Sequence, residues 1–245
     1  FIRLEYIMFK PKALNYEIDT GGLSMNQVVE LHNSLFVRKD YDWWYEILPG
    51  DTVVDIGAGI GAFSAKALDA GADRVYMIEP NRRLLKTAIK NVADYMMDGL
   101  SPKVIPINAA MGKTDIDLSN VHKSSIYKDP EEEPKLMSLA ELIEYHDLQT
   151  IDYLRVDADG SEYNILAHEH RDYLLAQVRF IAVKVNLSSQ YGGNEKFIDW
   201  KQQFLKCCRD QNRLFFQDSK MEEKLFHPRW WEHVPMSFMV YIKNW

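Results

Sequence analysis

The nine residues DIGAGIGAF (Asp55–Phe63) decide which fold this chain adopts. Three glycines, Gly57, Gly59 and Gly61, stand at alternate positions directly after the apolar run TVVDI. Glycine loses more backbone entropy on folding than any other residue, so its repeated use indicates that the absence of side chains is needed here. A tight strand-to-helix turn, a ligand held against the backbone, or both would need it. We therefore expect a strand that ends near Asp55 and turns straight into a helix.

Strand and helix patterns alternate from this turn toward the C-terminus. The strand patterns cover residues 52–56, 74–79, 103–108, 151–159 and 179–187, and the helix patterns cover 61–70, 81–95, 137–146, 162–175 and 195–211. Five such alternations predict a parallel sheet with helices on both faces. The segments RLFFQD (213–218) and SFMVYIKN (237–244) predict two more strands with no helix between them, hence a C-terminal antiparallel hairpin. The expected fold class is α/β, with a seven-stranded, mostly parallel, Rossmann-like sheet.

The first 50 residues have a mixed pattern. We expect residues 1–50 to form a helical or irregular extension packed on the core, and residues 51–245 to form one domain. The aromatic stretch YDWWYEIL (Tyr41–Leu48) reads as a helix that places Trp43 and Trp44 in that core.

Composition excludes several classes of protein. The net charge of −7 argues against broad nucleic-acid binding, although a local basic groove stays open. No apolar run approaches the roughly 20 residues of a membrane span, and no leader pattern is present. The two cysteines, Cys207 and Cys208, are adjacent and do not suit a disulfide, so we expect a cytoplasmic protein. The sequence carries no signal for an oligomeric state.

The glycine spacing separates two kinds of nucleotide site. A dinucleotide fingerprint is GxGxxG, whereas GAGIG places its third glycine one position earlier. GAGIG resembles motif I (DxGxGxG) of the class I methyltransferases that use S-adenosyl-L-methionine (AdoMet), in which the turn abuts the amino-acid part of AdoMet. A sheet of seven strands with the last one reversed is also the arrangement of that class. A tight turn without a ligand is the alternative interpretation.

Two later segments add to a cofactor site. Glu79 ends the second strand, where a carboxylate can accept hydrogen bonds from both ribose hydroxyls of NAD or AdoMet. Asn108-Ala109-Ala110 follows the third strand, where small side chains leave room for an adenine, although a plain turn would look the same. The predicted cofactor is AdoMet, and the predicted cofactor-binding residues are Asp55, Gly57, Ala58, Gly59, Gly61, Glu79, Asn108 and Ala109.

With IEP (Ile78–Pro80) and YLRVDADGSEYNIL (Tyr153–Leu166), the chain resembles the FkbM-type methyltransferase family. Members carry a DxGAxxGxF-like first motif, an IEP second strand and a later (K/R)xDxxGxE stretch, which Arg155, Asp157, Gly160 and Glu162 match. The resemblance covers Asp51 to the C-terminus and implies methylation of oxygen, often on hydroxyls of sugars or polyketide-like products. One departure bears on the acceptor: the fifth strand usually ends in an acidic residue followed by a histidine or similar group. Here VKVNLSS has Lys184 and Asn186, which leaves the acceptor class open.

The predicted catalytic residues are Asp157, Glu162 and Arg155. Methyl transfer from a sulfonium is an in-line displacement, so the protein must align the acceptor and can remove a proton. We expect Asp157 at a strand end next to the glycine turn, facing methyl group and acceptor. A structural Arg–Asp pair or a helix cap is the alternative. The spacing of Asp157, Asp159 and Glu162 hints at a cation, but it supplies too few oxygen ligands, and we predict no metal.

These observations favour an AdoMet-dependent O-methyltransferase acting on a hydroxyl of a saccharide or another small metabolite. A non-catalytic AdoMet-fold binding module is an alternative, which the unusual VKVNLSS segment keeps open. An NAD-dependent oxidoreductase is a further alternative, although GAGIG and the reversed final strand argue against it.

Overall fold

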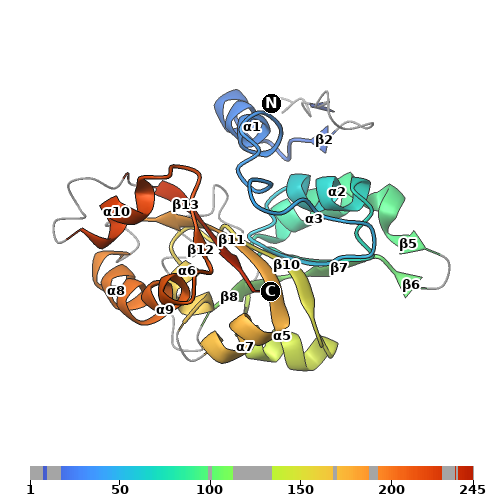
Figure 1. Cartoon of the computed structure of the whole chain (residues 1–245). Coiled ribbons are helices and arrows are strands. Elements are labelled where there is room, and N and C mark those ends of the chain that lie inside the picture. The colour runs from blue at the N-terminus through green and yellow to red at the C-terminus, as the bar shows by residue number, and fades with distance from the viewer. Residues whose placement is uncertain are drawn as a thin grey trace. The chain divides into compact units, whose positions relative to one another are not determined.

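The predicted fold class is confirmed. The structure is a computed structural model and describes residues 8–9, 18–98, 101–112, 134–167, 170–187, 193–227, 235 and 237–244. Its large sheet has seven strands in the order β12-β13-β11-β10-β3-β4-β7 (Figure 1). Neighbouring strands run parallel in the pairs β3–β4, β4–β7 and β10–β11, whereas β13 runs antiparallel to both β11 and β12.

The described residues fall into two compact units. Unit 1 comprises those up to Ala110 together with Pro134–Lys135, and unit 2 comprises Met111–Gly112 and those from Leu136 onward. Two short strands, β8 (Ala109–Met111) and β9 (Lys135–Met137), contain residues of both.

Unit 1 contains the first half of the sheet and the N-terminal elements. Its strands are β1 (Met8–Phe9), β2 (Ile18–Asp19), β3 (Thr52–Ile56), β4 (Arg74–Ile78), β5 (Met97–Asp98), β6 (Ser101–Pro102) and β7 (Val104–Ile107). Its helices are α1 (Met25–His32), η1 (Asn33–Val37), α2 (Ala62–Asp69), α3 (Arg82–Asn91) and η2 (Ala93–Tyr95).

Helices α2 and α3 cover one face of β3, β4 and β7 (Figure 1). Val53 and Val54 of β3 are wholly buried, and each such side chain contributes about 1.5–3 kcal/mol by leaving water. In α2, Ala65 and Ala67 are also wholly buried, and their small side chains let the helix approach the sheet closely. The glycine turn, Gly57–Gly61, joins β3 to α2 and therefore rests on this core.

Unit 2 contains the second half of the sheet. Its helices are α5 (Leu139–His146), α6 (Glu162–Ile165), α7 (Arg171–Gln177), α8 (Gly193–Trp200), η5 (Lys201–Leu205), α9 (Lys206–Asp210) and α10 (Met221–Phe226). Its strands are β10 (Ile151–Val156), β11 (Val178–Asn186), β12 (Leu214–Phe215) and β13 (Ser237–Lys243). Aromatic rings fill the core across these strands: Tyr153 on β10, Phe180 on β11 and Tyr241 on β13 are all wholly buried.

Helix α5 begins where its sequence predicts. Ser138 caps it by accepting a hydrogen bond from the Glu141 N–H, and the Glu141 carboxylate accepts one from the Ser138 N–H in return. By contrast, the predicted helix over residues 162–175 is two separate helices, α6 and α7.

The expectation of a helix-free connection between the last two strands was wrong. Helix α10 lies between β12 and β13, with Met221 and Leu225 buried four positions apart. Its spacing is that of one helical face, but six residues are too few for a clear period. The two strands still pair antiparallel, with Leu214 opposite Ile242.

The expected helix over Tyr41–Leu48 was also wrong. These residues form turns, bends and irregular structure. Tyr41 is buried, with its ring edge against Phe63, but Trp43 and Trp44 are exposed, and Trp43 donates its indole N–H to the Arg38 carbonyl. Trp43 and Trp44 are therefore not core residues, although they are aromatic.

No helix in the described part of the chain is long and apolar enough to cross a membrane.

Candidate functional site

The glycine turn in unit 1 is held by backbone hydrogen bonds. The Gly57 and Ala58 N–H groups both donate to the Ile78 carbonyl at 3.0 Å, and the Gly61 N–H donates to the Ala58 carbonyl at 2.8 Å. All three glycines have positive φ angles, 83° at Gly57, 57° at Gly59 and 77° at Gly61. The end of β4 therefore fixes the path of the turn that begins at the end of β3.

Two of these glycines serve different purposes. A Cβ atom added at Gly61 would lie 2.9 Å from the Ala88 Cβ, so this glycine lets α2 pack closely on α3. A Cβ atom added at Gly59 would meet no atom within 4 Å. Packing therefore does not explain the glycine at position 59, where the backbone borders open space.

Glu79 is fixed in place against the glycine turn. Its Oε2 accepts the Gly59 N–H at 2.9 Å and its Oε1 accepts the Asn81 N–H at 2.8 Å. The side chain is buried, so these hydrogen bonds are shielded from water. The geometry gives Glu79 one orientation, toward the backbone that borders the open space.

Asn108 connects the ends of two strands. Its Nδ2 donates to the Glu79 carbonyl at 2.9 Å and to the Pro80 carbonyl at 3.0 Å. Asn108 is half-buried, whereas Ala109 and Ala110 are buried. Thus Asn108 positions the segment that carries Glu79.

Asp55 and Ala58 lie inside the protein. The Asp55 side chain is wholly buried, and its Oδ2 accepts the Ser64 hydroxyl of α2 at 2.6 Å. Ala58 is buried as well. Asp55 therefore joins β3 to α2 beneath the turn.

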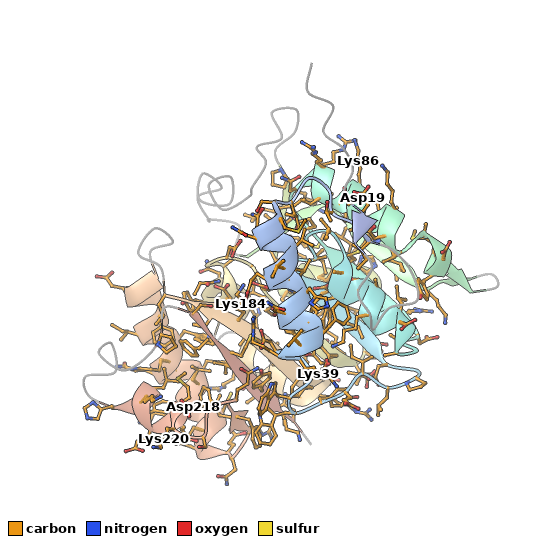
Figure 2. All side chains as sticks on the ribbon, turned by 90° about the horizontal axis from the view of Figure 1, so that it is seen from above. Asp19, Lys39, Lys86, Lys184, Asp218 and Lys220 are labelled. Carbon is orange, nitrogen blue, oxygen red and sulfur yellow. The ribbon has the colours of Figure 1, made fainter. Side chains whose placement is uncertain are left out.

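Asp157, the first of the two predicted catalytic carboxylates in unit 2, lies between two cations. Its Oδ2 accepts a hydrogen bond from the Arg155 guanidinium at 2.8 Å, and its Oδ1 is 3.4 Å from the Lys184 ammonium. Arg155 lies on β10 and is buried, and Lys184 lies on β11 (Figure 2). The Asp157 side chain is 17% exposed, so a molecule in solution can still contact it.

The second carboxylate, Glu162, has no exposed surface. Both of its oxygens accept from the Gly160 N–H, at 3.1 and 2.9 Å, and Oε1 also accepts from the Asn186 amide at 3.3 Å. The Tyr163 hydroxyl donates to the Asn186 carbonyl. These contacts join the end of β11 to the loop and helix that follow β10.

Burial and like charge change how these carboxyl groups titrate. Burial raises the pKa of Glu162 to about 7, with a further contribution from Asp157 and Asp159, while the Gly160 N–H lowers it. Partial removal from water and the charge of Asp157 raise the pKa of Asp159 to about 6, against the lowering effect of Lys184 and Arg155. The pKa of Lys184 is raised, chiefly by Asp157, so Lys184 is a cation at neutral pH.

Glu162 makes the stability of the protein depend on pH. Its pKa is 4.5 ordinarily and about 7 in the folded chain, so between these values the folded state binds more protons than the unfolded one. This group therefore lowers the free energy of unfolding as the pH rises through that window. We expect Glu162→Gln to remove this decline, a difference of about 2–3 kcal/mol, in urea unfolding at several pH values. The control Glu222→Gln, at an exposed position on α10, should keep the slope of the parent; an unchanged slope in Glu162→Gln would contradict the raised pKa.

The predicted residues thus gather in two groups. In unit 1, Gly59, Glu79 and Asn108 are joined by hydrogen bonds. In unit 2, Arg155 and Asp157 form an ion pair, and Glu162 lies nearby with separate partners. In the described residues, no three His, Cys, Asp or Glu side chains are grouped to hold a metal ion.

Sequence reasoning missed three residues that support these groups. Lys184 and Asn186, noted only as departures from a family pattern, contact Asp157 and Glu162. Their alternate positions on one strand were the available signal, because such residues share a face. Asn91 on α3 donates to the carbonyls of Asp19 and Ile60 and accepts the Asp19 N–H, contacts that no local sequence pattern indicates.

The strand order, with its reversed last strand and a glycine turn after β3, defines a class I AdoMet-dependent methyltransferase fold. The methyltransferase FkbM domain matches residues 55–213, more than half of the chain. The chain therefore belongs to the FkbM methyltransferase family. This membership sets the NAD-dependent oxidoreductase aside.

Several solved structures of methyltransferases are similar to this chain. The methyltransferase FkbM of Methylobacillus flagellatus KT is 16% identical, with a TM-score of 0.53; the match covers 86% of this chain and 47% of that one, so the present chain spans about half of that protein. The 16S rRNA N2 G1207 methyltransferase of T. thermophilus, solved with AdoMet and guanosine, is 11% identical over 98% of this chain and 50% of that one, with a TM-score of 0.47. TrmK of M. capricolum, solved with S-adenosyl-homocysteine, is 14% identical, with a TM-score of 0.42. The match covers 91% of this chain and 69% of that one. No curated protein matches the chain.

Proposed function

We propose that this chain transfers a methyl group from AdoMet to a hydroxyl of a saccharide or another small polar metabolite. The observation that carries the proposal is Asp157, a partly exposed carboxylate held between the cations of Arg155 and Lys184. Family membership supplies the reaction class, and this carboxylate is a group that can accept the hydrogen bond of an acceptor hydroxyl. Both cysteines are free, which supports a reducing compartment such as the cytoplasm.

The residues of unit 1 fit AdoMet. Open space at Gly59 leaves room for a ligand against the backbone, and the Glu79 carboxylate, held beside Gly59, is the acceptor that we assign to the ribose hydroxyls. Asn108 holds the neighbouring segment, where we place the adenine. AdoMet, when bound, supplies an electrophilic methyl group on a sulfonium.

In unit 2 the two carboxylates suit different tasks. Glu162 has no exposed surface, so it holds the loop through Gly160 rather than meeting an acceptor. Asp157 is exposed enough to accept the hydrogen bond of an acceptor hydroxyl and to take its proton as the oxygen attacks. Arg155 fixes the direction of this carboxylate. Because fixed charges surround Asp157, a polar, hydroxyl-rich acceptor fits better than an apolar one.

Glu79→Ala should weaken AdoMet binding by about 1.5–3 kcal/mol, or tenfold to over a hundredfold, because ribose hydroxyls lose a charged acceptor. Isothermal titration calorimetry measures this. The variant also deprives the Gly59 and Asn81 N–H groups of their acceptor, so its melting temperature should fall.

Ser64→Ala is the matched control for that loss of stability. It removes a buried hydrogen bond to Asp55 beneath the same turn without changing a group assigned to the cofactor. It should lower the melting temperature and leave AdoMet affinity within a few-fold of the parent. If Glu79→Ala binds AdoMet as well as Ser64→Ala does, Glu79 does not hold the ribose.

Two experiments test the function as a whole. Melting curves with AdoMet, S-adenosylhomocysteine and NAD should show stabilisation by the first two only, since a ligand stabilises the state that binds it. Turnover with radiolabelled AdoMet on a panel of sugars and other hydroxyl compounds then identifies the acceptor. Binding of AdoMet without turnover on any member would favour a non-catalytic AdoMet-fold module.

A further inference from the structure

Lys184 stands where one cation meets two carboxylates. It lies on β11, in which Ala182 pairs with Arg155 and Val183 with Val156 of β10. Lys184 comes two positions after Ala182, and Asp157 comes two positions after Arg155, so this register places Lys184 opposite Asp157. The Lys184 ammonium is 3.4 Å from the Asp157 Oδ1. Its side chain is 40% exposed, so the ammonium borders both the carboxylate and the solvent.

The charges of unit 2 around Asp157 come from three elements. Arg155 on β10 and Lys184 on β11 are cations, and Asp159 and Glu162 in the following loop and helix are acids. The charge of Asp157 raises the pKa of Asp159, and the charges of Lys184 and Arg155 lower it; Asp157 and Asp159 in turn raise the pKa of Lys184. When two carboxylates interact without a sufficient counter-charge, one of them keeps its proton to a higher pH than an isolated carboxyl group does.

We propose that Lys184 is a positioning residue whose ammonium acts as the shared counter-ion of Asp157 and Asp159, so that Asp157 stays ionised at neutral pH and accepts the hydrogen bond of the acceptor hydroxyl. This inference rests on the proposed function for its role in turnover. Arg155 orients the other oxygen of Asp157, so the carboxylate is held from both sides. Lys184 does not exchange the proton itself, because its ammonium remains charged.

The test measures carboxyl titrations directly, without cofactor or acceptor. Carboxyl ¹³C NMR of the full chain between pH 3 and 9, with Asp157→Asn and Asp159→Asn to assign the signals, gives the midpoints of the two groups. Lys184→Met should raise the midpoints of this pair by about one pH unit, the lower end of the range for loss of a nearby opposite charge. Lys184→Arg should restore them to within a few tenths of a unit.

The matched control is Arg179→Met, because Arg179 lies on the same strand and pairs with Asp152 of β10 at 3.1 Å. It removes one ion pair between the same two strands and should leave the Asp157 and Asp159 midpoints unchanged. Once an acceptor is known, Lys184→Met should lose kcat/KM at pH 6 by less than about tenfold, the limit that a rise of one pH unit sets, and lose less at pH 8.5.

Unchanged midpoints in Lys184→Met, or equal shifts in Arg179→Met, would overturn the inference. Should Lys184→Met fail to fold, Lys184→Gln gives the same measurement with a polar side chain. A shift in the midpoints without turnover on any acceptor would uphold Lys184 as the counter-ion and reject the proposed function.

Discussion

Gly59→Val should abolish AdoMet binding while the chain still folds. A Cβ atom at position 59 meets no protein atom within 4 Å, so the added side chain would extend into the open space beside the turn, where we place the ligand. The φ angle of 57° also strains a β-branched residue, which should lower the melting temperature by several degrees. Calorimetry with AdoMet measures the affinity, and circular dichroism shows that the fold is retained.

Gly61→Ala is the control for Gly59→Val. Its Cβ would come within 3.0 Å of the Ala88 backbone, so it should destabilise the fold by about 1–3 kcal/mol through crowding of α2 against α3. Gly59→Ala adds the backbone strain with the smallest side chain and separates strain from obstruction. If Gly59→Val binds AdoMet with the affinity of the parent, the glycines serve only the fold.

Asp157→Asn should lower kcat on the order of 10²–10⁴-fold once the acceptor is known. Asparagine keeps the size and one oxygen acceptor but cannot take the hydroxyl proton. AdoMet affinity should stay within a few-fold of the parent, because we assign no cofactor contact to Asp157. Steady-state kinetics and calorimetry on the same preparation measure both quantities.

Asp152→Asn is the matched control, since Asp152 lies on β10 and pairs with Arg179 as Asp157 pairs with Arg155. It should leave kcat near that of the parent. Loss of AdoMet binding alone in Asp157→Asn would place the residue beside the cofactor instead. Unfolding would show that the Arg155 pair is structural, and full turnover would mean that transfer needs only alignment of the acceptor.

The sequence predicted those parts of the fold that depend on local pattern. The alternation of apolar strands with helices predicted a mostly parallel sheet, and the helix pattern over 137–146 predicted α5. At the candidate site, GAGIG predicted a tight strand-to-helix turn, and the structure shows such a turn with positive φ angles at its glycines. Each of these features is determined within a few residues of chain.

The rest depended on contacts between distant residues. Helix α10 has six residues, too short for its period to stand out between two strands. Nothing in the local sequence indicates that Trp43 and Trp44 are exposed. Of these neighbouring aromatic residues, Tyr41 is the one that the fold buries, against Phe63. The roles of Lys184 and Asn186 follow from the register of β11 against β10, which places them beside carboxylates more than twenty residues away in sequence.

The side chain of Asn91 has a consequence for how AdoMet and the N-terminal segment affect each other. It bonds the backbone of Asp19 and, with the same amide group, the carbonyl of Ile60 in the glycine turn. Detaching residues 18–21 therefore loosens the turn, and a ligand that tightens the turn makes detachment harder. By thermodynamic reciprocity, the factor by which the docked segment improves AdoMet affinity equals the factor by which AdoMet favours docking. At the AdoMet site proposed above, the segment before β3 would therefore adjust cofactor affinity, although it carries none of the family's motifs.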